Sequence, residues 1–173
     1  MIEVKTNQQQ NIRLLAVKAL SEINRNGAYA NIKLQEYLQK YHLSDLDRRF
    51  FTELVYGVIR RKNYLDAIIV FFAKRPLKKL SSMVVEILRL GIYQIIYMDK
   101  VPESAAVNES VKLAKKLTRG LSGFVNAVLR SVLRESDSIS IGELAKSEAE
   151  EISFIYNQPL WLVNLWIKEM GKD

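Results

Sequence analysis

Rows of cationic side chains are the feature of this sequence whose residue types and spacing indicate a chemical role. In residues 101–134, four cations follow Asn108 at a spacing that places them on one side of a helix. They are Lys112, Lys115, Lys116 and Arg119. A second row, spaced four residues apart, comprises Asn126, Arg130 and Arg134. Cations presented in rows by a packed scaffold are typical of a surface that binds a polyanion such as RNA.

A cationic triplet closes another predicted helix, residues 45–62. It comprises Arg60, Arg61 and Lys62. One hypothesis is that it forms a second RNA-binding patch together with Arg130 and Arg134. The alternative is structural, because cations in a last helical turn are favoured by the helix dipole. Phosphate contacts from any of these rows would supply affinity but little sequence discrimination.

The asparagines and the cationic linker 74–79 allow two interpretations each. Asn126 has the chemistry to contact a base or a ribose. The alternative, which we favour, is that Asn108 and Asn126 form structural hydrogen bonds between helices. The linker contains four cations around Pro76, and we interpret it as a solvated loop rather than a binding element.

Residues for autonomous catalysis, metal binding or cofactor binding are absent from the sequence. The chain has no cysteine and a single histidine, His42, so neither a thiolate nucleophile nor a zinc site is available. No two glycines lie closer than Gly120 and Gly123, which excludes a glycine-rich phosphate loop. We therefore expect no catalytic, cofactor-binding or metal-binding residue in this chain.

Helical periodicity and scarce turn formers predict an all-α fold. The 173 residues include only 7 Gly and 3 Pro, and apolar positions recur at helical spacing. The predicted helices of the first part span 11–27, 28–41, 45–62, 64–73, 81–98, 102–119 and 121–134. Segment 81–98 is apolar nearly all round, which predicts enclosure by other helices. Within it, Gly91 is expected to permit close approach of a neighbour.

The charge changes sign along the chain. Residues 1–134 hold 23 Lys and Arg against 11 Asp and Glu, a balance of +12, whereas residues 135–173 hold 3 against 8, a balance of −5. The second part contains two further predicted helices, 143–157 and 159–170. We expect the basic part to meet a polyanion and the Trp-bearing tail to meet something else. No apolar run is long enough to cross a membrane, so we expect a cytoplasmic protein with no membrane partner.

Four motifs resemble those of one bacterial family. They are GAYAN at 27–31, DRRFFTELVYGVIR at 47–60, ILRLGIYQIIYMDKVPESAAVNESVKLAKK at 87–116 and GFVNAVLR at 123–130. In this order and spacing, the chain is similar to the NusB-like N-terminal domain of the 16S ribosomal RNA cytosine-C5 methyltransferases of the RsmB (Sun) type.

The resemblance implies an all-α, NusB-like bundle of about seven helices followed by a short helical connector. It divides the chain into a frayed N-terminus (1–9), an RNA-binding domain (10–135) and a linker with the start of the connector (136–173). In that family the catalytic module binds S-adenosylmethionine and attacks cytosine C6 with a cysteine thiolate. Since this chain has no cysteine, the resemblance implies a fragment that is not itself an enzyme and that helps to position 16S rRNA.

Two alternatives stay open. The first is a NusB transcription antitermination factor, which binds RNA and a ribosomal protein. This alternative is disfavoured by Ala127 and Arg130, because antiterminators tend towards Gly and Asp at these positions. It is also disfavoured by the tail at 157–166. The second is a protein-docking domain without a strong RNA site, in which the bundle serves mainly to dock against the catalytic module. Apart from these alternatives, the resemblance implies that the catalytic module is a partner in cis, through the region of Trp161 and Trp166.

Overall fold

The computed structural model describes residues 11–27 and 29–171, and all the regular secondary structure in these ranges is helical. The predicted frayed segment, 1–9, lies outside the described residues. The α-helices are α1 (Ile12–Asn26), α2 (Ala30–Lys40), α3 (Asp45–Arg60), α4 (Lys62–Ala73), α5 (Ser82–Tyr97), α6 (Glu103–Leu117), α7 (Ser122–Glu135), α8 (Ile141–Leu144), α9 (Glu148–Tyr156) and α10 (Leu160–Met170). Two short 3₁₀ helices lie between them: η1 (Leu77–Lys79) between α4 and α5, and η2 (Ser136–Ser138) between α7 and α8. The all-α prediction is therefore confirmed.

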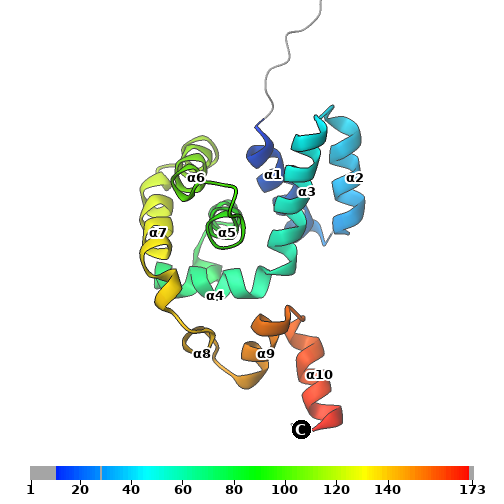
Figure 1. Cartoon of the computed structure of the whole chain (residues 1–173), viewed down its shortest axis with the longest axis vertical. Helices are drawn as coiled ribbons and strands as arrows, with labels where there is room; N and C mark the ends of the chain where they lie inside the picture. Colours follow the sequence, from blue (N-terminus) through cyan, green and yellow to red (C-terminus); the bar gives the residue numbers. More distant parts are fainter. Residues whose placement is uncertain (1–10, 28, 172–173) are drawn as a thin grey trace, which may run out of the picture.

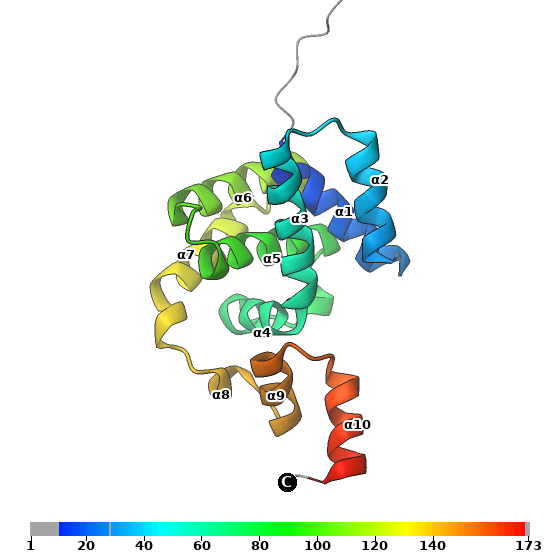
Figure 2. The same ribbon diagram turned by 45° about the vertical axis from the view of Figure 1, so that its right-hand side comes forward.

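Helix α5 is the centre of the bundle, as its apolar sequence predicts. Every residue from 84 to 94 is buried, and Figure 1 shows α5 enclosed by α1, α3, α4, α6 and α7. Helices α6 and α7 form an antiparallel pair against one side of α5, while α1 and α3 cover the other and α2 packs on the outside of α1 and α3 (Figures 1 and 2). None of the described helices is long and apolar enough to span a membrane.

Local sequence signals set the helix ends. The side chains of Asn11, Ser44 and Ser81 each accept a hydrogen bond from a backbone N–H in the first turn of α1, α3 and α5. Gly27 ends α1 in the left-handed conformation, with φ of 61°. Helix α6 begins one residue later than the predicted range 102–119, because Pro102 is its N-cap, with ψ of 133°.

A glycine on α5 allows α6 and α7 to approach closely. A Cβ built on Gly91 would lie 2.8 Å from Ser110 Oγ and 3.0 Å from both methyl carbons of Leu129. The expected role of Gly91 is thus confirmed, and it fixes the α6–α7 pair on the bundle.

The C-terminal helices form a second, smaller layer beneath α4. Figure 2 shows α8, α9 and α10 on the far side of α4 from α5, and α8 and α9 contact α4. Helix α10 packs mainly on α9 and buries only Val163. Trp161 is 68% exposed and Trp166 is 38% exposed, so much of the apolar surface of α10 is uncovered.

Candidate nucleic-acid interface

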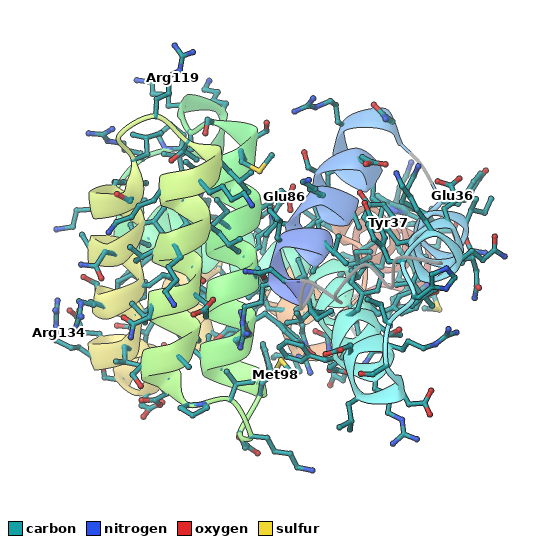
Figure 3. All side chains as sticks on the ribbon, turned by 90° about the horizontal axis from the view of Figure 1, so that it is seen from above. Glu36, Tyr37, Glu86, Met98, Arg119 and Arg134 are labelled. Atoms are coloured by element: carbon teal, nitrogen blue, oxygen red, sulfur yellow. The ribbon has the colours of Figure 1, made fainter. Side chains whose placement is uncertain are left out.

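The predicted row on α6 lies at the surface of the bundle. Lys112, Lys115, Lys116 and Arg119 are all exposed. Figure 3 places Arg119 at the α6–α7 turn and Arg134 at the other end of α7, on the side of the helix pair away from α1 and α3. The two helices carry their apolar residues inward, where Leu113, Ala114, Val125 and Leu129 are buried. The scaffold therefore presents these cations to solvent.

The cations of this row differ in whether they are already neutralised. Lys112 forms an ion pair with Glu109 one turn earlier, at 2.7 Å. Lys115, Lys116 and Arg119 form no ion pair with any residue that the structure describes. Three uncompensated cations therefore converge on the end of α6 and the α6–α7 turn. We call Lys112, Lys115, Lys116 and Arg119 together the α6 row.

The second row is engaged within α7. Arg130 Nε donates to Asn126 Oδ1 at 3.1 Å. Arg134 donates to Ser131 Oγ at 3.2 Å and lies 3.7 Å from a carboxylate oxygen of Glu135. The interpretation of Asn126 as an interhelical link is wrong, because its bond stays on one helix. Asn108 is exposed and has no hydrogen-bond partner among the described side chains.

The triplet at the α3–α4 junction is held by contacts with α1 and α5, and its grouping with Arg130 and Arg134 in one patch stays a prediction. Arg61 lies over the Tyr97 ring, with 4.6 Å from its guanidinium carbon to the ring centroid. Lys62 Nζ donates to Asn24 Oδ1 at 2.7 Å. The triplet lines a hollow shared with the α9–α10 turn, to which neither α6 nor α7 contributes. Of the three, Arg60 is exposed and forms no ion pair with any residue that the structure describes.

The linker 74–79 lies beside the start of α7, and its cations are exposed, as expected of a solvated loop. Arg75 lies over the ring of Phe124, with 5.8 Å from its guanidinium carbon to the ring centroid. Because Phe124 stands in the first turn of α7, this contact brings the linker to the α6–α7 turn. Lys74, Lys78 and Lys79 are exposed beside it. In the sequence, the only signal for this contact was the aromatic Phe124 at the start of α7. Its partner, Arg75, lies about fifty residues earlier in the chain.

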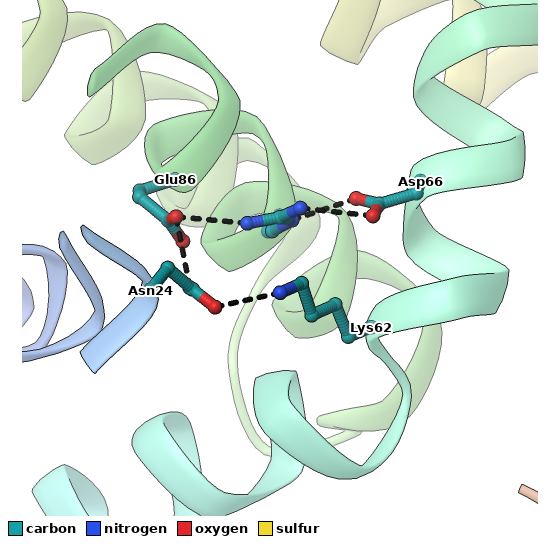
Figure 4. Close-up of polar contacts among 5 residues, drawn as sticks. Asn24, Lys62, Asp66 and Glu86 are labelled. Carbon is teal, nitrogen blue, oxygen red and sulfur yellow. Dashed lines mark hydrogen bonds and ion pairs between the residues drawn. The ribbon is translucent and has the colours of Figure 1, made fainter. Parts of the chain in front are cut away.

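A buried ionic network lies on the opposite side of α5. Arg89 donates to both carboxylate oxygens of Asp66, at 2.7 and 2.8 Å, and to Glu86 Oε1 at 2.8 Å. Asn24 also donates to Glu86 Oε1, at 2.9 Å, and accepts from Lys62 (Figure 4). Burial raises the pKa of Glu86, and the charge of Arg89 opposes that shift. Segment 81–98 thus buries charged residues that helical periodicity left without an assigned role.

Metal-binding geometry is not present in the described part of the chain, where no three His, Cys, Asp or Glu side chains are grouped closely enough to hold an ion. The exposed side chains of the candidate interface offer charge and hydrogen-bond donors. Its arrangement suits a backbone of phosphates, which lysine and arginine contact without a metal.

Comparison with known proteins identifies the sequence and the fold. The NusB family matches residues 10–134. A probable ribosomal RNA small subunit methyltransferase B from Synechocystis is 41% identical over 92% of this chain, which spans 36% of that protein. The transcription antitermination protein NusB of Finegoldia magna is 30% identical over 75% of this chain and 96% of its own. The solved structure of Thermotoga maritima NusB superimposes with a TM-score of 0.66, at 24% identity, covering 72% of this chain and 89% of that one.

Proposed function

The chain belongs to the NusB family, and from that premise we propose that it binds RNA through the α6 row. The observation that carries this proposal is the set of exposed cations, Lys115, Lys116 and Arg119, that have no carboxylate partner among the described residues. Unpaired cations on a rigid helix pair attract phosphates without first breaking an ion pair.

The more specific proposal is that this RNA is 16S ribosomal RNA, held for cytosine-C5 methylation by a catalytic module outside this chain. The similarity to small-subunit rRNA methyltransferase B supports it, and the chain spans about a third of the length of those relatives. S-adenosylmethionine would bind that module and supply the methyl group. The residues of this chain would hold and orient the RNA.

We further propose that α10 contacts the catalytic module. Trp161 and Trp166 are exposed on a helix whose buried contacts are few. Large exposed aromatic side chains are typical of protein interfaces. This contact would leave the α6–α7 side free for RNA, because α10 lies beyond α4 from that helix pair (Figure 2).

The proposal is tested by the salt dependence of RNA binding. A fluorescent small-subunit rRNA hairpin would be titrated with the chain and with a variant carrying Ala at all four positions of the α6 row. Each phosphate contact contributes roughly 0.7–0.9 to the slope of log K against log salt, so the variant should be shallower by about 3.

A matched control removes the same charge elsewhere. Ala at Lys18, Arg48, Arg49 and Lys168 deletes four exposed cations away from the α6–α7 turn. This control should keep most of the original slope. An equal loss of slope in both variants would contradict a localised site and would leave only general attraction to a basic protein.

A further inference from the structure

A hollow of about 390 Å³ opens beside the buried network, between the end of α1, the start of α4 and the start of α5. Figure 3 shows Glu86 between α1 and α5, on the side of α5 away from α6 and α7. Val85, Glu86 and Arg89 line its deep part, where each is buried. We call it the Glu86 hollow. Its volume lies within the range of roughly 300–1,000 Å³ that small-ligand sites occupy.

One acceptor in this hollow has no donor. The side chain of Glu86 is only 4% exposed, and its Oε1 atom receives both of the hydrogen bonds made by Asn24 and Arg89. The other oxygen, Oε2, is buried and has no hydrogen-bond partner among the described residues. A buried carboxylate oxygen without a donor is costly. A ligand that brings an N–H group to Oε2 would remove that cost.

The rest of the lining indicates what else such a ligand carries. The rim is cationic, with Arg25, Lys62 and Lys78. Leu77 and Leu80 provide apolar walls. A flat group with an N–H donor, attached to a negatively charged chain, complements all three features. A cationic protein segment would bring the donor but would be repelled by the rim.

The linker 74–79 connects this hollow to the RNA surface. Arg75 contacts the start of α7, whereas Lys78 lies on the rim of the hollow. The exposed cations of the linker therefore form a path from the α6–α7 turn to the hollow. A single strand that follows this path would reach the Glu86 hollow with one of its bases.

We propose that the Glu86 hollow binds one unpaired RNA base that carries an amino group on its Watson–Crick edge. Glu86 Oε2 accepts a hydrogen bond from that amino group, while Lys62 and Lys78 contact the flanking phosphates. Carboxylates accept from the cytosine amino group in the same way elsewhere, and unpaired bases are the usual targets of sequence-specific RNA binding. This inference rests on the proposed function, since it assigns a base-reading position to the same RNA.

Because Oε2 is buried, this proposal includes the opening of one surface contact beside it. Lys62 Nζ reaches Asn24 Oδ1 at 2.7 Å beside the carboxylate (Figure 4), and Asn24 itself is exposed. On binding, Lys62 exchanges this amide oxygen for a phosphate oxygen. Arg89 stays in place, because Asp66 holds it through two hydrogen bonds.

The test compares two fluorescent hairpins that share a stem and differ in a loop of cytidines only or uridines only. Uracil presents an acceptor where cytosine presents its amino group. The unaltered chain should bind the cytidine loop roughly tenfold more tightly, as expected for one lost base contact. Glu86→Gln turns Oε2 into an amide donor and should abolish or reverse this preference. Glu151→Gln makes the same charge change at an exposed site on α9 and should keep it.

Two further variants keep the test decisive if Glu86→Gln is unstable. Ser82→Trp fills the hollow from an exposed position on its lining and should also remove the cytidine preference. Lys78→Ala should weaken the binding of both hairpins equally and reduce the salt slope by roughly 0.7–0.9.

Equal binding of both loops by the unaltered chain, or a preference that survives Glu86→Gln or Ser82→Trp, overturns the inference. If the α6 row still governs the salt slope, the proposed function stands without it. If the unaltered chain binds neither hairpin, both fall together.

Discussion

Gly57→Ala should destabilise the fold although it adds a better helix former. Gly57 lies in α3, and a Cβ there would overlap Cζ and Oη of Tyr93 on α5. Tyr93 is 5% exposed and donates a hydrogen bond to Glu53, so the ring has to shift within a packed core. Overpacking costs about 1–3 kcal/mol, and the strained hydrogen bond about 1 kcal/mol more. The gain in helix propensity is only about 1 kcal/mol. A net loss of about 1–3 kcal/mol follows.

Gly123→Ala is the matched control for this prediction. Gly123 is exposed in α7, and nothing lies within 4 Å of a Cβ built there. The same substitution should therefore be neutral or stabilising by up to about 1 kcal/mol. Urea unfolding followed by circular dichroism measures both variants. Equal stability of the two variants would refute the conclusion that the α3–α5 contact depends on a glycine. The same conclusion would be refuted if Gly57→Ala is destabilised and adding Tyr93→Leu restores none of the lost stability.

Two further stability predictions test the buried network and the C-terminal layer. Arg89→Met leaves Asp66 and Glu86 without their cation and should cost about 3–5 kcal/mol at pH 7. Burial already raises the pKa of Glu86, so the folded variant binds that proton more tightly than the unfolded chain. The loss in free energy of unfolding, relative to the unaltered chain, should therefore shrink as the pH falls towards about 4.3. Urea unfolding at several pH values measures this loss, and a loss that grows as the pH falls would contradict the reasoning. Val163→Ala should cost about 2 kcal/mol, since Val163 is 1% exposed. Trp161→Ala should stay within about 0.5 kcal/mol, and a large loss would mean that α10 packs more closely.

The helices and the surface cations could be predicted because both depend on neighbours in the sequence. The spacing of Lys112, Lys115 and Lys116 fixes one helical side whatever the helix packs against, whereas Arg119 lies beyond the end of α6 at Leu117. The small size of Gly91 on an apolar helix likewise predicts a close contact, although not with which helix. The Lys112–Glu109 ion pair is also local, since the two residues are three apart.

The role of the polar residues on α5 was decided only by the tertiary structure. Glu86 and Arg89 are polar positions on an apolar helix, and their partners come from α1 and α4. The same holds for Lys62, whose position in sequence predicts a surface cation but whose ammonium group is bound to Asn24. Periodicity assigns a residue to a face of its own helix and carries no information about a partner tens of residues away.

By itself, the sequence determined that the chain is all-α, that its first part is basic and that it resembles the NusB-like domains. Only the packing of the helices decided which cations are free. It bound Lys62 to Asn24, brought Arg75 to Phe124 and left Glu86 Oε2 without a donor beside a hollow. The physical reason is that a hydrogen bond or ion pair depends on distances of about 3 Å between atoms, and such distances between separate helices exist only once the core has packed.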